Sequence, residues 1–509
     1  MQIELLDTTL RDGEQTSGVS FSLSEKLGIT RLLLDELHVS RIEIASARVS
    51  SGEFDSVKEV CSWAKKNGYL DRIEILGFID NGQSVKWIEK VGGKVVNFLA
   101  KGSEKHCRSQ LKKTPEEHLH DIKNEVQNAV KAGLTVNLYL EDWSNGIKNS
   151  PAYVYHMVDS LKDLPIRRFM LPDTLGIMNP NEVYEYCKRM IEAYPTLHFD
   201  FHAHNDYDLA TANSFAAGLV GIHGLHCTIN GLGERAGNAP LSSVVAVIHD
   251  MLKKETSIDE TKINKISHIV ESFSGIMVPA NKPIIGESVF TQCAGVHADG
   301  DNKNNLYFND LLPERFGRER EYALGKTSGK ANIKKNLEAL GIELSEENIR
   351  KVTNRIIELG DKKEMVTPGD LPFIVADVLK HDIQHNKVRI INYALSLSQG
   401  LRPTATTKME INGNEYQESA VGDGQYDAFV KAVRRIYNEL LNREFPMLTN
   451  YSVNIPPGGS TDALVQTTIS WNYKGHMIKT RGLDADQIEA AIQATVKMLN
   501  IIEYIIPLL

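Results

Sequence analysis

Short apolar runs alternate with longer amphipathic stretches over the first half of the chain. Runs rich in apolar and β-branched residues are typical of buried strands, and they lie at 3–7, 41–45, 72–78, 94–99, 135–141, 168–172, 198–202 and 225–229. Apolar positions between these runs recur at helical spacing. Eight strand–helix units within about 250 residues predict a (β/α)8 TIM barrel. A doubly wound parallel sheet is the alternative, although it would usually contain fewer strands.

Two helix starts in this region carry a specific signature. Thr114 and Glu117 form a T-x-x-E capping box, with Pro115 at the first helical position. Ser22 and Glu25 repeat the same spacing. Both pairs predict that a helix begins at the next residue.

The pattern changes after about residue 270. Residues 275–325 are rich in Gly, Pro, Asn and Asp and predict a loop-rich connector. Helical periodicity follows over 329–380 and predicts helices at 334–340, 346–359 and 370–378. From about residue 388, strand-like runs at 388–394, 406–411, 450–455 and 463–471 mix with helical stretches at 427–441 and 485–499, which predicts a compact α+β module. We therefore expect three domains: a catalytic barrel at 1–270, a mostly helical connector at 271–387 and an α+β domain at 388–509.

Composition places the chain among ordinary globular proteins. Of its 509 residues, 42% are hydrophobic and 24% are charged, and the net charge is −9. These values exclude a wholly disordered or fibrous chain, and the acidic balance argues against nucleic-acid and membrane partners. The sequence shows no membrane-length apolar run and no signal-peptide pattern at its start. Five scattered cysteines without a C-x-x-C pair fit reduced thiols, so we expect a cytoplasmic location.

The most specific local chemistry lies at the ends of two predicted strands. His202 and His204 are separated by one residue, so their imidazoles point to the same face of a strand and can share a divalent metal. A hydrogen-bonded histidine pair is the plainer alternative. Asp12 follows the first strand and can add a carboxylate ligand, while Arg11 beside it can stabilise a developing alkoxide. An ordinary surface Arg–Asp pair is the alternative for these two.

Polar segments follow three further strands. Glu141 ends the fifth strand and can orient a base or a water molecule, and Thr174 after the sixth can bind a substrate carboxylate. The segment 230–238, NGLGERAGN, has Ala236 where a dinucleotide-binding loop needs its third Gly, so we reject that interpretation. Because active sites of TIM barrels form where the carboxyl ends of the strands meet, these segments together predict one active site there.

Four segments resemble one known family: LRDGEQ at 10–15, HAHND at 202–206, NGLGERAGN at 230–238 and GVHADG at 295–300. They are similar to the Claisen-like condensing enzymes with a DRE-type metal barrel, which include isopropylmalate, homocitrate and citramalate synthases. The resemblance covers essentially the whole chain. It implies a divalent metal (zinc, manganese or magnesium) and acetyl-CoA as co-substrate. It also implies a homodimer in which the connector of one subunit covers the partner's barrel.

The resemblance also implies roles for individual residues. Asp12, His202 and His204 would be metal ligands, with Asn238 near the metal. Arg11 would stabilise the oxygen of the substrate ketone, and Thr174 would hold the substrate carboxylate. The remaining catalytic residues that it implies are Glu141, His297 and Tyr307.

Among the members of this family, the segments 47–50, 139–146 and 297–307 look most like those of the citramalate synthases. These enzymes condense pyruvate with acetyl-CoA in the first step of a threonine-independent route to isoleucine. Tyr139 shares the face of Glu141 and, with Leu76 and Leu99, would narrow the pocket to fit a methyl group. Ordinary barrel core is the alternative for the two leucines. A 2-isopropylmalate synthase, which uses 2-oxoisovalerate, is the alternative enzyme. A homocitrate synthase would need a cationic group for the distal carboxylate, and we see no clear candidate.

The C-terminal module resembles the feedback domain of the same family, whose effector in citramalate synthases is usually isoleucine. The candidate effector residues are Tyr426, Asp427, Pro457 and Ala463, and ordinary turn and capping roles are the alternative. A catalytically silent amino-acid sensor is the non-enzyme alternative for the whole chain. The intact candidate catalytic residues argue against it.

Overall fold

The described part of the chain comes from a computed structural model. It covers residues 2–505 apart from 302, 304–305, 341, 362–365, 367–370, 372–373, 376–377, 379–386, 455–464 and 475. The chain divides into two units, Met1–Phe290 with Phe308–Arg320, and Thr291–Tyr307 with Glu321–Leu509.

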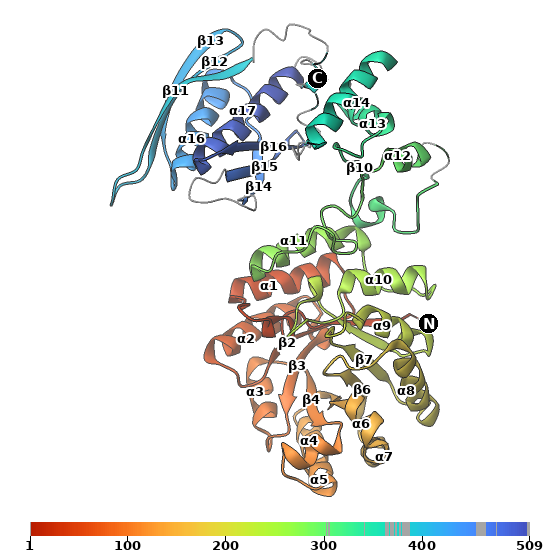
Figure 1. Ribbon diagram of the computed structural model, residues 1–509. Coiled ribbons are helices and arrows are strands. Elements are labelled where there is room, and N and C mark those ends of the chain that lie inside the picture. The colour runs from red at the N-terminus through yellow and green to blue at the C-terminus, as the bar shows by residue number, and fades with distance from the viewer. Residues whose placement is uncertain are drawn as a thin grey trace. The chain divides into compact units, whose positions relative to one another are not determined.

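The first unit contains a closed barrel of eight strands that follow one another around the barrel in sequence order (Figure 1). The strands are β1 (Glu4–Asp7), β2 (Arg41–Ser46), β3 (Ile73–Phe78), β4 (Val95–Lys101), β5 (Thr135–Glu141), β6 (Ile166–Asp173), β7 (Phe199–Ala203) and β8 (Gly224–Cys227). All neighbouring strands pair in parallel, including β1 with β8. Each predicted apolar run overlaps one of these strands, so the TIM-barrel prediction is confirmed.

Helices surround the strands of this barrel. They are α1 (Leu23–Arg31), α2 (Ser51–Lys66), α3 (Gln83–Val91), α4 (Glu104–Ser109), α5 (Pro115–Lys131), α6 (Trp143–Asn149), α7 (Pro151–Leu161), α8 (Pro180–Ala193), α9 (Ala210–Leu219), α10 (Leu241–Asp250) and α11 (Ile263–Ser274). Both predicted capping boxes are present, at the starts of α1 and α5. A short π-helical segment, Leu32–Glu36, continues α1.

Charged and amide side chains fill much of the interior of the barrel below its mouth. Arg41 donates to Glu74 (2.8 Å) and to Asp200 (2.5 Å), and each of these residues is at most 4% exposed. Asn97 donates to Glu43 (2.7 Å) and to Glu74 (2.8 Å). Buried charges are tolerated only when they are paired and hydrogen-bonded, as they are here. The network therefore gives the residues above it a rigid, polar support.

The second unit begins with the connector. It contains β9 (Thr291–Gln292), β10 (Glu321–Tyr322), α12 (Gly295–Asp301), α13 (Lys330–Ala339) and α14 (Glu346–Asp361). Leu324, Ile333, Leu337, Ile349, Val352 and Ile356 contribute to its separate hydrophobic cluster. Part of the segment predicted to be loop-rich thus forms one helix and two very short strands. The helix expected at 370–378 lies largely outside the described residues.

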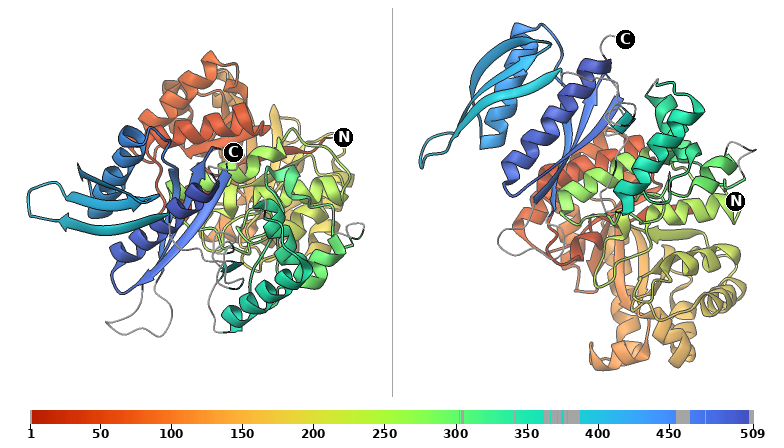
Figure 2. Two further views of the ribbon diagram at one scale, coloured as in Figure 1. Left: turned by 90° about the horizontal axis from the view of Figure 1, so that it is seen from above. Right: turned by 45° about the horizontal axis from the view of Figure 1, so that its top comes forward.

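The C-terminal part of the second unit consists of two antiparallel three-stranded sheets, each packed against a helix (Figure 2). The first sheet is β11 (Val388–Ser396), β12 (Thr404–Ile411) and β13 (Asn414–Val421), and its helix is α16 (Gln425–Arg435). The second is β14 (Met447–Asn454), β15 (Val465–Tyr473) and β16 (His476–Asp484), and its helix is α17 (Gln487–Ile505). The α+β prediction is confirmed, although β13 and β16 were not among the predicted strands. None of the described helices is both long and apolar enough to cross a bilayer.

Candidate active site

Asp12, His202 and His204 meet at the mouth of the barrel. One potential ligand atom from each lies within 4.8 Å of the others, and the three residues are 1%, 3% and 7% exposed. Nε2 of His202 is 3.3 Å from Oδ2 of Asp12, and Nε2 of His204 is 3.9 Å from the same oxygen. The structure therefore brings together all three residues that were expected to be metal ligands.

Local backbone geometry explains how these side chains converge. The carbonyl of Thr8 accepts hydrogen bonds from the amides of Arg11, Asp12 and Gly13, which makes a tight turn directly after β1. His202 lies within β7, and the bridge between His204 and Asn238 joins the segment after β7 to the segment after β8. These turns bring the three ligand candidates together and place Asn238 on the segment that is bridged to His204.

Burial sets the protonation states of this group. It lowers the pKa of both imidazoles, that of His204 to about 4. Burial alone would raise the pKa of Asp12, but Arg11 and the two imidazoles hold it well below its usual range. At neutral pH the group therefore presents neutral imidazoles and a carboxylate, which are the forms that bind a metal ion.

Four buried polar atoms show that these residues fit a cation. Oδ1 of Asp12, Nδ1 of His202, Nδ1 of His204 and Oδ1 of Asn238 have no hydrogen-bond partner among the described residues. Unpaired polar atoms are rare in protein interiors, and here one occurs on each residue that was expected to surround the metal. Among them, Oδ1 of Asp12 is free to bind a cation, and its Oδ2 already lies near Nε2 of both imidazoles. Two imidazoles with a carboxylate are a common ligand set for divalent transition metals.

Arg11 is held beside this group by two carboxylates. Its Nε donates to Glu43 (2.5 Å), and its Nη1 is 3.2 Å from Asp12. Its guanidinium also lies 5.9 Å from the ring centre of Tyr139. Burial alone would lower the pKa of Arg11, but Glu43 and Asp12 outweigh burial and raise it. The guanidinium is thus a fixed positive charge beside the candidate metal ligands.

Glu43 was not identified from the sequence. It lies in β2 between the apolar residues Ile42 and Ile44, and it is fully buried. A charged residue inside a strand that is buried on both faces is the signal that could have revealed it.

The hydroxyl and the carbonyl of Thr174 are both held by hydrogen bonds. Its hydroxyl accepts a hydrogen bond from the amide of Asp142 (2.9 Å), so its own proton can be donated to another acceptor. Its carbonyl accepts from Arg235 (2.8 Å), and Arg235 also donates to both carboxylate oxygens of Asp206 (2.8 and 2.9 Å). Arg235 therefore joins the segments that follow β6, β7 and β8.

A small apolar cluster lies inside the barrel beside the candidate metal ligands. Its members are Leu6, Leu76, Tyr139 and Met170, with the partly buried Leu99 packed against them. The Tyr139 ring meets the His202 ring edge-on, with 6.3 Å between the centroids. The Tyr139 hydroxyl lies 3.1 Å from Nδ1 of His226 and 3.4 Å from Glu43. The three residues expected to line the pocket are thus neighbours, and Tyr139 is fixed in place.

Glu141 forms an ion pair with Lys101, which the sequence did not single out. The two residues end β5 and β4 and are paired in register. The pair could not be recognised from the sequence, because no local motif shows how the two strands are aligned.

The remaining catalytic candidates, His297 and Tyr307, belong to the second unit. His297 lies in α12, and its ring centre is 4.3 Å from that of Tyr307. The structure therefore brings these two side chains together, and their expected role at a barrel mouth stays a prediction.

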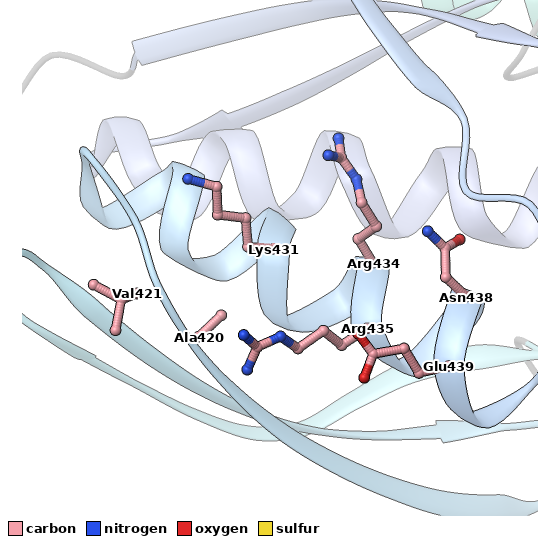
Figure 3. A pocket seen from close by; sticks show the side chains of 7 residues that line it. All are labelled: Ala420, Val421, Lys431, Arg434, Arg435, Asn438 and Glu439. Carbon is pink, nitrogen blue, oxygen red and sulfur yellow. The ribbon is translucent and has the colours of Figure 1, made fainter.

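The structure describes two of the four candidate effector residues, Tyr426 and Asp427. Tyr426 shares a hydrogen bond with Thr495 (2.7 Å), and Asp427 pairs with Lys431 (2.7 Å). Lys431 and its neighbours on α16 line a surface hollow of about 180 Å³ next to β13 (Figure 3). Pro457 and Ala463 lie outside the described residues.

Three families match successive parts of the chain. The HMGL-like family matches residues 2–270, the homocitrate synthase post-HMGL domain-like family matches 284–364, and the LeuA allosteric (dimerisation) domain matches 365–503. The chain therefore belongs to the HMGL-like metal-barrel enzymes and, within them, to the isopropylmalate, homocitrate and citramalate synthases, which are condensing transferases.

Two relatives from Methanocaldococcus jannaschii show how far this similarity reaches. One is named as an (R)-citramalate synthase; it is 32% identical and covers 99% of this chain and 100% of its own length. The other is named as a 2-isopropylmalate synthase; it is also 32% identical and covers 98% of this chain and 94% of its own length. Overall sequence similarity therefore shows the family but does not distinguish between the two named activities. The preferred 2-oxo acid has to be argued from the residues of the site. The LeuA dimerisation domain indicates an oligomeric protein.

Proposed function

We propose that this protein condenses acetyl-CoA with pyruvate and water to give (R)-citramalate, CoA and a proton. The observation that carries the proposal is the position of Tyr139. Its ring packs against the cluster that contains Leu76 and Leu99, and it lies beside His202. A fixed aromatic ring at this place leaves room for the methyl group of pyruvate and crowds the isopropyl group of 2-oxoisovalerate.

In this proposal, Asp12, His202 and His204 hold a divalent cation (zinc, manganese or magnesium), with Asn238 beside it. A bound divalent cation supplies Lewis-acid polarisation of a ketone oxygen. Arg11 adds a positive charge beside that oxygen and stabilises the alkoxide that forms. Thr174 donates its free hydroxyl proton to the carboxylate of the 2-oxo acid and orients it.

The carbon–carbon bond requires removal of a proton from the methyl group of acetyl-CoA. We assign this step to Glu141 together with His297, with Tyr307 beside His297. The resulting enolate attacks the ketone carbon, and water then hydrolyses the thioester to release CoA.

The domain division belongs to the same proposal: 1–270 for catalysis, 271–387 for a connector that completes the partner's active site in a homodimer, and 388–509 for regulation. Isoleucine would bind near Tyr426, Asp427, Pro457 and Ala463 as a feedback inhibitor. We also place the protein in the cytoplasm, and its five unpaired cysteines are consistent with a reducing compartment.

Replacement of Tyr139 tests the pocket. In Tyr139→Ser, the space above the cluster opens, so the ratio of kcat/KM for pyruvate to kcat/KM for 2-oxoisovalerate should fall by about tenfold or more. Free CoA release with each 2-oxo acid measures both values. An unchanged ratio would show that Tyr139 does not line the substrate pocket.

Tyr139→Phe is the matched control. It keeps the ring and loses only the hydroxyl contacts with His226 and Glu43. Selectivity for pyruvate should therefore remain in this variant. The unfolding temperatures of both variants show whether the barrel is intact.

A further inference from the structure

Lys101 and Glu141 lie one layer above the apolar cluster. On β4 and β5, Leu99 is paired with Tyr139, and two residues later Lys101 is paired with Glu141. Because side chains two residues apart on a strand point to the same face, Lys101 and Glu141 also face the interior of the barrel. They are closer to its mouth, since they end their strands.

The position of Lys101 is unusually well fixed. The residue is only 7% exposed, its amide donates to Nε2 of His118 (3.1 Å), and its carbonyl accepts from the hydroxyl of Tyr153 (2.9 Å). Its ammonium group donates to Oε2 of Glu141. A buried lysine is costly unless its charge is compensated, so this ion pair is part of how the mouth of the barrel is built.

The pair fits the charge arrangement around the mouth. Asp12 is paired with Arg11, Asp206 with Arg235, and Glu141 with Lys101. A 2-oxo acid enters this region as an anion. An uncompensated carboxylate at the position of Glu141 would repel it, because charges interact strongly where water is scarce.

We propose that Lys101 is a positioning residue that holds the Glu141 carboxylate at the mouth of the barrel and cancels its charge where an anionic 2-oxo acid binds. The inference rests on the proposed condensation, in which Glu141 takes part. It does not depend on which 2-oxo acid the enzyme prefers.

Four variants test this role with the 2-oxo acid that the wild-type enzyme uses best. Lys101→Met removes the charge and keeps an unbranched side chain, whereas Lys101→Arg keeps the charge. Lys101→Met/Glu141→Gln removes both charges, and Glu141→Gln alone is its reference. Lys105→Met is the control, since Lys105 is an exposed lysine on α4 just beyond the same strand.

In Lys101→Met, KM for the 2-oxo acid should rise and kcat should fall, each by about tenfold or more, because Glu141 is left charged and unheld. Lys101→Arg should recover most of both parameters. In the double variant, KM should return to within about threefold of the wild-type value while kcat stays at the level of Glu141→Gln. If Lys101 only filled space, the double variant would not recover KM while kcat stayed low.

The proposal is overturned if Lys101→Met behaves like Lys105→Met, or if the double variant keeps the raised KM. A wild-type protein that releases no CoA with any 2-oxo acid contradicts the proposed function instead. In that case, the dissociation constant of the manganese-loaded protein for pyruvate, measured by calorimetry, replaces KM. The same rise in Lys101→Met and the same recovery in the double variant are then expected, and their absence overturns the role of Lys101.

Discussion

At the scale of single residues, the candidate metal group is a set of buried polar atoms that lack partners. Each such atom costs about 1–3 kcal/mol when it is left unsatisfied. One atom of each residue is of this kind among the described residues: Oδ1 of Asp12, Oδ1 of Asn238, Nδ1 of His202 and Nδ1 of His204. A divalent cation held by Asp12, His202 and His204 would give the unpaired carboxylate oxygen of Asp12 a partner, and an ion that binds only the folded state should stabilise the barrel.

Removal of one imidazole tests this directly. His202→Ala should lower the affinity for zinc or manganese by about 100-fold or more, because two ligands bind far more weakly than three. The metal content after dialysis and the rise in unfolding temperature on metal addition measure the effect, and neither readout depends on activity. His268→Ala, an exposed histidine on α11, should bind metal like the wild type. Full metal occupancy in His202→Ala would show that the ion is held elsewhere.

The sequence predicted these residues unevenly. Asp12, His202 and His204 stood out because each follows or ends an apolar run, and the ends of barrel strands converge. Glu43 and Lys101 did not stand out, because their partners come from other strands. Arg11, in the turn after β1, contacts Glu43 on β2, and Glu141 contacts Lys101 across the β4–β5 pair. Such contacts depend on strand alignment, which the order of residues alone does not give.

At the scale of elements, helix α5 supports the end of strand β4. His118 in its first turn is buried, and it accepts the amide hydrogen of Lys101. Burial is the largest cause that lowers the pKa of His118, and the positive charge of Lys113 lowers it further. Together they bring the pKa to about 4. The imidazole must therefore stay neutral to keep this contact.

His118 should make the barrel sensitive to acid. Its pKa is lower in the folded than in the unfolded protein, where it is about 6.5, so the unfolded state gains protons first. The contribution of neutral His118 to the free energy of unfolding is complete above about pH 6.5 and is lost as the pH falls toward 4. His118→Gln keeps an acceptor and does not titrate, so its unfolding temperature should fall less than that of the wild type between pH 7 and pH 4.5.

The exposed His120 on the same helix provides the comparison, and His120→Gln should follow the wild-type curve. Several other buried histidines also have lowered pKa values, so only part of the acid sensitivity should disappear. Parallel curves for His118→Gln and the wild type would contradict the role of His118.

Elements were more predictable than single contacts. All eight barrel strands and the capping boxes at Thr114 and Ser22 followed from patterns within one segment. Strands β13 and β16 were missed because their residues alternate without a strongly apolar face. In β13, for example, Ala420 is the only residue that is fully buried among the described positions of that strand.

At the scale of the whole molecule, the chain combines a barrel with a second unit that contains the LeuA-type domain. The barrel contains the candidate metal group, Arg11 and the apolar cluster around Tyr139. His297 and Tyr307 lie in the second unit. A homodimer in which one subunit completes the site of the other is the arrangement that we propose.

We propose that the site of this chain is built for pyruvate. The most direct measurement is the release of free CoA by the metal-loaded wild-type protein with acetyl-CoA and pyruvate, 2-oxoisovalerate or 2-oxoglutarate in turn. We predict that kcat/KM for pyruvate exceeds that for 2-oxoisovalerate by about tenfold or more. A clear preference for 2-oxoisovalerate, or no CoA release with any of the three acids, would contradict it.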